Sequence, residues 1–322
     1  MGARKLVENQ SPAVGLLQSV VKNVASVIKG KDEVILKTIA TWVSGGHVLL
    51  EDVPGTGKTM LARAIAKSVN VSFKRAQFTP DMLPSDLLGT NIFNRKTQDF
   101  DFRPGPIFST LFLADEVNRA TPRTQSALLE AMSEKQISID GKTYALDPLF
   151  FVIATANPVE QAGTFPLPEA QLDRFAVRMT LGYPDDANER EIVLAQQSVH
   201  PIESVAPVIE AETLLQIRSA AEAIEIHKPV LDYAIAIVKK TRAQSQIALG
   251  ASPRATIALI KLAKVLAMMK GHSFVSPDQI QDLIKPVLCH RILLTADARF
   301  SGETAFNVLD EVMHSVPVPV GL

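Results

Sequence analysis

The sequence predicts an α/β fold with a parallel five-stranded sheet, helices on both faces of that sheet, and a smaller all-helical domain after it. The first observation is a series of short apolar runs separated by helical segments, at residues 47–50, 72–77, 111–114, 150–155 and 175–181. Such runs are typical of buried parallel strands. The second observation is that only helical periodicity follows Tyr183, as far as about Leu294. We therefore expect an α/β domain over residues 1–183 and a helical domain with a C-terminal tail over residues 184–322.

The composition limits what kind of protein this can be. With 322 residues, 47% of them hydrophobic, the chain can bury a large core without disulfides, and intrinsic disorder is excluded. The 33 basic and 34 acidic residues give a net charge of −1, so binding to nucleic acid is not expected. The one cysteine, Cys289, excludes an intramolecular disulfide and fits a cytoplasmic location. No run approaches the roughly 20 apolar residues of a membrane span.

Helical periodicity and turn residues define the remaining elements in chain order. A helix from Val14 to Ile28 stops at Gly30, and a second one covers residues 32–43. Two insertions interrupt the α/β pattern: residues 79–108 form a long loop or hairpin, and residues 136–149 form a hairpin with an Asp-Gly turn. The later helices are expected at residues 185–199, 211–223, 229–245, 253–269 and 277–288, and an extended tail at 316–320.

The strongest functional pattern is a glycine-rich loop at residues 52–59, between the first predicted strand and a helix. This is the strand–loop–helix context of a phosphate-binding P-loop. Gly55 and Gly57 can turn backbone N–H groups toward phosphate oxygens, and the helix N-terminus adds partial positive charge. Lys58 supplies a cation for the β- and γ-phosphates, and the Thr59 hydroxyl can bind Mg²⁺. The loop departs from the usual pattern at Asp52, where glycine is common.

Two further strands end in polar residues that fit the same chemistry. The run at 111–114 is followed by Asp115 and Glu116, and the run at 150–155 is followed after Ala156 by Asn157. Because the carboxyl ends of parallel strands meet at one edge of a sheet, these side chains should lie near the P-loop. Asp115 can then contribute to Mg²⁺ binding, Glu116 can polarise an attacking water, and Asn157 can contact the γ-phosphate and the water. The second acid favours hydrolysis over simple nucleotide storage.

With these residues in place, the chain resembles the AAA+ ATPases and, within them, the MoxR family. Lys58, Asp115, Glu116 and Asn157 match the Walker A, Walker B and sensor 1 positions. The MoxR resemblance is carried by residues 46–55, 114–122, 156–158 and 173–175, and it extends from about Val24 to Leu294. Asp52 is familiar in that family. The resemblance implies that ATP and Mg²⁺ are the cofactors.

The resemblance also implies roles for residues that patterns alone leave open. Arg174 matches an arginine finger that reaches the γ-phosphate of a neighbouring subunit, although a surface ion pair with Asp173 is the structural alternative. Arg254 matches sensor 2, and we place it in the site of its own subunit. The adenine is expected beside Ile28 and Gly30, and the two insertions are expected to face the pore or the substrate. The expected nucleotide contacts are Pro54, Gly55, Thr56, Gly57, Lys58, Thr59 and Met60.

The function that this resemblance implies is Mg²⁺-dependent ATP hydrolysis by a ring, a hexamer, that remodels or matures a partner protein. Such partners often carry a von Willebrand factor A domain. A magnesium-chelatase-like motor subunit is the main alternative, and a nucleic-acid motor is disfavoured by the neutral charge. A GTPase-type switch is a third alternative, but the chain lacks an Asn-Lys-x-Asp or Thr-Lys-x-Asp guanine motif.

Overall fold

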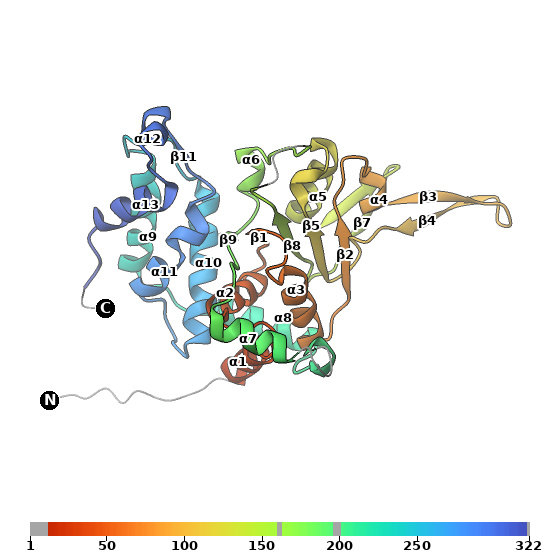
Figure 1. Cartoon of the computed structure of the whole chain (residues 1–322), viewed down its shortest axis with the longest axis horizontal. Coiled ribbons are helices and arrows are strands. Elements are labelled where there is room, and N and C mark those ends of the chain that lie inside the picture. Colours follow the sequence, from red (N-terminus) through yellow and green to blue (C-terminus); the bar gives the residue numbers. More distant parts are fainter. Residues whose placement is uncertain (1–11, 160–162, 196–200, 321–322) are drawn as a thin grey trace.

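The computed structural model describes residues 12–159, 163–195 and 201–320, and it contains the predicted central sheet (Figure 1). Its strands lie in the order β2-β5-β8-β1-β9, and each neighbouring pair is parallel. Their bounds are β1 Val48–Glu51, β2 Phe73–Gln77, β5 Leu111–Asp115, β8 Phe151–Ala156 and β9 Val177–Met179. The five apolar runs are therefore confirmed as strands, and all five carboxyl ends lie at one edge.

Alternate side chains of the strands enter two hydrophobic cores, one on each face of the sheet. Leu50, Leu113 and Ile153 pack in the core that contains α1 (Pro12–Ala25), α2 (Asp32–Val43) and α3 (Lys58–Ser68). Phe112, Val152 and Ala154 pack in the core that contains α5 (Pro122–Glu134). This alternation follows from the period of two in a β-strand. Helices on both faces are thus confirmed.

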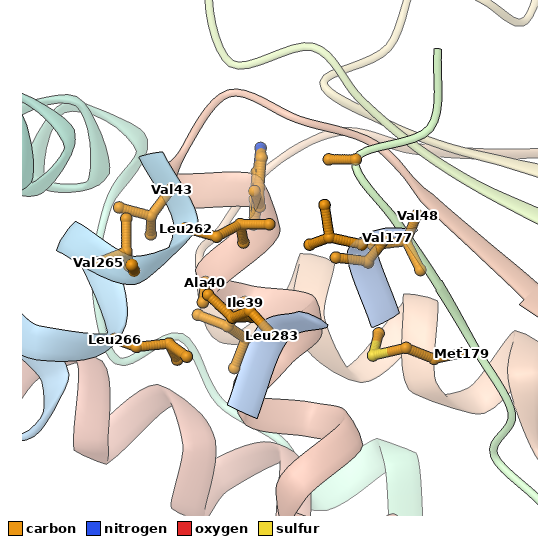
Figure 2. Packing of buried hydrophobic residues seen from close by; sticks show 14 of the residues in the cluster. Ile39, Ala40, Val43, Val48, Val177, Met179, Leu262, Val265, Leu266 and Leu283 are labelled. Atoms are coloured by element: carbon orange, nitrogen blue, oxygen red, sulfur yellow. The ribbon is translucent and has the colours of Figure 1, made fainter. Parts of the chain in front are cut away.

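Helix α2 joins the sheet to the later helices, as Figure 2 shows. Ile39 and Val43 of α2 lie against Leu262 and Leu266 of α10 (Pro253–Met269), and Leu283 of α11 (Pro277–Leu288) lies in the same cluster. The apolar side chains of β1 and β9 continue this cluster. The helical region and the sheet therefore share one continuous core, which lets the helices hold a defined position beside β9.

The region after Tyr183 is mainly helical, with two differences from the predicted pattern. A short antiparallel ribbon of β10 (Ile247–Leu249) and β11 (Leu293–Leu294) lies among the helices, because strands this short carry no readable alternation. Two further helices, α12 (Ala296–Phe300) and α13 (Ala305–His314), begin at threonine caps that the prediction missed. The other helices are α7 (Asp186–Ala195), α8 (Ala211–Glu222) and α9 (Lys228–Thr241). The predicted helical residues 196–199 lie outside the described residues.

The first segment after Tyr183 packs on helices of the α/β region. Lys67 Nζ of α3 donates to the carbonyl oxygen of Ile202 at 2.9 Å, and Asn23 Nδ2 of α1 donates to that of Ala206 at 2.8 Å. Residue 202 lies in a 3-10 turn, η2 (Pro201–Ser204). The segment just after residue 183 is therefore held by helices α1 and α3 of the α/β region. The domain boundary at residue 183 stays a prediction.

Both insertions contain β-hairpins. Residues 79–108 contain α4 (Pro84–Leu88) and the antiparallel strands β3 (Gly89–Asn94) and β4 (Asp99–Pro104), which project far from the body (Figure 1). The second hairpin pairs β6 (Gln136–Ile139) with β7 (Lys142–Ala145), and its turn residues Asp140 and Gly141 both have positive φ. The two hairpins touch, since Asn91 Nδ2 donates to Asp140 Oδ2 at 2.6 Å.

Short elements complete the chain: η1 (Val117–Arg119) follows β5, and α6 (Glu169–Leu172) precedes β9. Residues 317–320 adopt no regular secondary structure, as expected of the proline-containing tail. Among the described helices, none combines the length and apolar character that crossing a membrane requires.

Candidate nucleotide-binding site

The loop between β1 and α3 has the backbone of a phosphate-binding loop. Gly55 and Gly57 have φ values of +85° and +95°, a region that strongly favours glycine, and Gly57 is the N-cap of α3. Lys58 Nζ donates to the carbonyl oxygens of Asp52 at 3.1 Å and Val53 at 2.7 Å, so the ammonium group is held over the loop. Burial lowers the pKa of Lys58, and the carboxylates of Asp52, Asp115 and Glu116 oppose that shift.

Asp52, the departure from the usual loop pattern, ties the loop to the segment after β9. Its side chain is buried; Oδ1 accepts from the backbone N–H of Val53 at 2.9 Å, and Oδ2 accepts from that of Gly182 at 2.6 Å. A glycine could not make this connection. The sequence identified the residue as unusual but carried no signal of its partner, because Gly182 is 130 residues away.

Asp115, at the end of β5, is held by residues from both neighbouring strands. Oδ1 accepts from Thr155 Oγ1 of β8 at 2.6 Å, and Oδ2 accepts from Arg75 Nη2 of β2 at 2.7 Å. Thr155 Oγ1 also accepts from the backbone N–H of Glu116 at 2.8 Å, so one hydroxyl orients both acids. Sequence reasoning missed Thr155 and Arg75. The available signal was their place near the carboxyl ends of predicted strands.

Glu116 and Asn157 are fixed by separate sets of contacts. Glu116 adopts a left-handed backbone conformation (φ 58°), and its Oε2 accepts from Gln77 Nε2 at 2.7 Å and from Arg119 Nη1 at 3.0 Å. Asn157 Oδ1 accepts from the backbone N–H of Val159 at 3.1 Å, and Asn118 Nδ2 donates to the Asn157 carbonyl at 3.1 Å. Non-glycine residues held at positive φ are concentrated at functional sites.

These groups line a single cavity of about 400 Å³. A second cavity of similar volume adjoins it on the far side of the P-loop, and Gly55, Gly57 and Met60 line both. The first cavity contains Pro54, Lys58, Thr59, Arg75, Gln77, Asp115, Glu116, Thr155 and Asn157. The second is more apolar and contains Ile28, Thr56, Tyr183, Ile192 and Val193. One charged and one apolar compartment fit the phosphates and the base of a nucleotide.

Gly30 stands beside this second compartment. Its φ is +67°, and a Cβ at this position would lie 2.4 Å from Asn188 Nδ2 of α7. A side chain at this position would displace the Asn188 side chain, and the positive φ favours glycine. Gly30 is not among the residues that line the compartment, whereas Ile28 lines it directly.

A larger cavity of about 550 Å³ lies between α2, β9, α11 and α13, and none of the predicted site residues lines it. Its cations already have carboxylate partners: Lys37 pairs with Glu33, and Lys285 pairs with Asp310 at 2.8 Å. A phosphate group would find no uncompensated positive charge from these lysines. The smaller cavity at the P-loop is therefore the better nucleotide site, despite its size.

The residues in the P-loop cavity fit a magnesium ion that arrives with a nucleotide. Thr59 and Asp115 line the same cavity, and hydroxyl and carboxylate oxygens are ligands that Mg²⁺ accepts. Mg²⁺ typically takes one or two protein ligands, several waters and phosphate oxygens. Within the described ranges, no group of three or more His, Cys, Asp or Glu side chains is arranged to hold a metal by itself.

Arg174 and Arg254 do not line the P-loop cavity. Arg174 Nη1 donates to the carbonyl oxygen of Leu129 in α5 at 2.6 Å, and Arg254 Nη1 lies 3.3 Å from Asp173 Oδ2. Asp173 precedes β9, whereas the P-loop follows β1, and these two strands are parallel. Both arginines therefore lie toward the opposite edge of the sheet from the P-loop. Our placement of Arg254 in the site of its own subunit is not supported by this geometry.

Comparisons with known proteins identify relatives that match most of the chain. Residues 47–177 match the model of the ATPase family associated with various cellular activities (AAA), and residues 239–312 match the AAA lid domain. The chain is 46% identical over 305 residues to the uncharacterized protein YeaC of Bacillus subtilis, covering 95% of each chain. It is 37% identical to chaperone MoxR1 of Mycobacterium tuberculosis, over 97% of this chain and 85% of that protein.

Two further similarities cover nearly the whole molecule. The chain is 30% identical to protein MoxR of Methylorubrum extorquens, over 92% of this chain and 94% of that protein. A crystal structure of a Cytophaga hutchinsonii protein described as a candidate ATPase superposes with a TM-score of 0.89, at 37% identity and with 95% and 96% coverage. The resemblance that the sequence motifs indicated thus extends to both the α/β and the helical regions.

Proposed function

Because this chain belongs to the MoxR family of AAA+ ATPases, we propose that it hydrolyses ATP in an Mg²⁺-dependent reaction and uses the energy to remodel a protein partner. The observation that carries the proposal is the convergence of Lys58, Asp115, Glu116 and Asn157 on one 400 Å³ cavity. The apolar compartment beside it takes the adenine against Ile28, with Met60 between base and phosphates.

Each residue in the cavity has a distinct task in this proposal. Lys58 and the N-terminus of α3 bind the phosphates, and Thr59 with Asp115 binds the Mg²⁺ that accompanies them. Mg²⁺, when bound, neutralises charge on the phosphate oxygens. Glu116 orients and polarises the attacking water, and Asn157 contacts that water and the γ-phosphate. Gln77 and Arg119 hold the Glu116 carboxylate before the reaction, at 2.7 and 3.0 Å.

We further propose that the complete site forms between two subunits of a ring, a hexamer by family resemblance. Arg174 and Arg254 lie on the opposite side of the subunit from the cavity, so they can reach a phosphate only in a neighbouring copy. A guanidinium from that copy would stabilise the charge that develops on the transferred phosphoryl group. The position of Arg254 beside Asp173 changes its proposed role from the subunit's own site to its neighbour's.

The projecting hairpin is the proposed contact for a protein client. Ile92, Phe93 and Phe100 are each at least half exposed, and the rings of Phe93 and Phe100 meet edge to face at 5.4 Å. An exposed apolar patch away from the body suits apolar segments of a protein client. A partner with a von Willebrand factor A domain is one such client. A cytoplasmic location is also proposed, since the one cysteine of the sequence, Cys289, is a free thiol.

The substitution Glu116→Gln tests the central proposal. It removes the carboxylate that polarises water but keeps an amide that Gln77 and Arg119 can still contact. Turnover should fall at least about 10²-fold while ATP binding is retained. Glu130→Gln, an exposed acid on α5, is the matched control and should leave turnover unchanged. Unchanged turnover in Glu116→Gln would refute the role of Glu116, and the ATP-bound variant is the best bait for capturing the client.

A further inference from the structure

Arg291 is a buried charged residue outside the nucleotide site, at the end of the segment that follows α11. Its side chain is only 2% exposed. Its guanidinium donates to the carbonyl oxygens of Phe175 at 2.7 Å, Ala176 at 3.1 Å and Asp173 at 3.2 Å, and Nε donates to Asp173 Oδ1 at 2.8 Å. A fifth bond goes to the Val287 carbonyl oxygen of α11 at 2.7 Å. Four of its five bonds thus hold one short segment, residues 173–176.

Other residues of the helical region bind the same segment. His290 Nε2 lies 2.9 Å from the Phe175 carbonyl oxygen, which fits a neutral ring that donates there, because burial lowers the pKa of His290 to about 3. Ser252 Oγ donates to Asp173 Oδ2 at 3.1 Å, next to the Arg254 pair. The segment is therefore attached to the helical region at the start of α10 and at the end of α11.

Arg174 lies inside this segment, and its own side chain contacts the other side. It donates to the Leu129 carbonyl oxygen of α5, in the α/β region. The carbonyl groups on either side of Arg174, those of Asp173 and Phe175, are thus bound by the helical region, while the Arg174 guanidinium contacts the α/β region. The α/β region also holds the end of the segment, because the Ala176 N–H donates to the His47 carbonyl oxygen at 2.8 Å. A shift of the helical region relative to α5 would therefore move Arg174 away from α5 and break its 2.6 Å bond to the Leu129 carbonyl oxygen.

We propose that Arg291 is a positioning residue that makes residues 173–176 move with the helical region, so that the helical region of one subunit sets Arg174 at its neighbour's site. This inference rests on the proposed role of Arg174 and adds to it a means by which one site senses the conformation of the adjacent subunit. Arginine is required because its planar fork reaches several acceptors at once, whereas a lysine ammonium is a single point of charge. Arg291→Lys therefore keeps the charge beside Asp173 but loses most of the carbonyl bonds.

The test separates the subunit that hydrolyses ATP from the subunit that donates Arg174. Wild-type protein is mixed with an excess of donor subunits that carry Lys58→Ala, so all hydrolysis occurs at wild-type sites. Three donors are compared: Lys58→Ala alone, with Arg174→Ala added, and with Arg291→Lys added. We expect the Arg291→Lys donor to lower wild-type turnover at least tenfold relative to the plain donor. The ATP concentration at half-maximal rate should change less than threefold.

Two controls distinguish positioning from misfolding. Lys270→Met removes an exposed ion pair with Asp282 in the same helical region and should behave like the plain donor. Thermal unfolding and ring assembly of the Arg291→Lys donor are measured in parallel, and a second donor, Arg291→Met, replaces it if it does not assemble. A folded, assembled Arg291 donor with no effect, beside a strong effect of Arg174→Ala, overturns the proposal alone. If the Arg174→Ala donor is also without effect, the arginine-finger assignment and the proposal both fail.

Discussion

The five parallel strands end along one side of the sheet, here called the carboxyl edge, and begin along the opposite side, the amino edge. Both edges carry charged residues, but these residues make different kinds of contact. At the carboxyl edge, Lys58, Asp115 and Glu116 line an open cavity, and their contacts orient them toward it. At the amino edge, where the five strands begin, Asp173 and Arg291 bind each other, and Arg291 also donates to backbone carbonyl oxygens. The first arrangement suits a ligand, and the second suits holding two regions of the chain together. In our proposal, hydrolysis needs the carboxyl edge of one subunit and the amino edge of the neighbouring subunit.

The largest expected effect comes from removing Arg174, the amino-edge residue that we propose acts at the site of the neighbouring subunit. Arg174→Ala should lower turnover by about 10³-fold or more, because an arginine finger stabilises charge only in the transition state. ATP affinity should change little, since Arg174 does not line the cavity of its own subunit. Steady-state ATPase assays and calorimetry with a non-hydrolysable analogue measure the two quantities. Arg63→Ala, an exposed arginine on α3, is the control. A loss of ATP affinity with turnover intact would contradict the proposal that Arg174 acts only at the neighbouring subunit's site.

Acid should destabilise the fold through His47, a buried histidine just before β1. Burial lowers the pKa of His47 to about 4, and its Nδ1 accepts from the Val152 N–H at 3.0 Å, so the folded state keeps the ring neutral. The unfolded chain takes up a proton near pH 6.5 and the folded chain does so only near pH 4. The stabilisation is therefore complete above pH 6.5 and is lost as the pH falls toward 4, by about 3 kcal/mol in total.

Chemical unfolding of wild type and His47→Gln at several pH values measures this effect. The variant cannot titrate at this position, so its unfolding free energy should fall less steeply between pH 6.5 and 4. His314→Gln, at an exposed histidine of α13, should keep the wild-type slope. Parallel curves for wild type and His47→Gln would show that the proton taken up on unfolding belongs to other groups.

A threonine pair compares the two edges directly. Thr155→Val removes the hydroxyl that contacts Asp115 Oδ1 and the Glu116 N–H, so turnover should fall about tenfold to a hundredfold. Thr110→Val removes a hydroxyl that donates to Asp147 Oδ2 at 2.7 Å, at the amino end of β5. Both substitutions should destabilise the fold, but only Thr155→Val should reduce turnover per folded subunit. Equal turnover losses would mean that stability alone explains both.

The smallest expected effect is that of Arg254→Ala on stability. The side chain is 59% exposed in its pair with Asp173, and exposed ion pairs contribute at most about 1 kcal/mol. Thermal unfolding should therefore change little. Turnover of wild-type neighbours should nevertheless fall when Lys58→Ala donors also carry Arg254→Ala. If the variant instead loses ATP affinity as an isolated subunit, Arg254 acts in its own site, and the comparison of the edges must be revised.

Much of the carboxyl edge could be predicted because its residues follow strands that the sequence marks clearly. A run such as 111–114 has a readable end, and the first polar residues beyond it fall at the edge where the P-loop lies. Arg75 and Gln77 escaped prediction because polar residues in an edge strand are ordinarily solvent-facing. Only the pairing of β2 with β5 shows that they reach Asp115 and Glu116.

The amino edge was predicted less well because its contacts join residues far apart in the chain. Arg254 matches the sensor 2 position, but its partner Asp173 is 81 residues away, and no local pattern indicates which side of the subunit Arg254 faces. Arg291 carried no motif at all. Its burial becomes visible only when α11 packs beside β9.

The sequence by itself determined the strand–loop–helix unit, the acids after the third strand and the family, because each depends on residues adjacent in the chain. The tertiary structure alone decided that Asp52 binds Gly182, that Arg254 pairs with Asp173, and that Arg291 binds residues 173–176 just before β9. The physical reason is the same in each case. A buried charge is stable only with partners, and those partners come from whichever elements the packing of the two cores brings together.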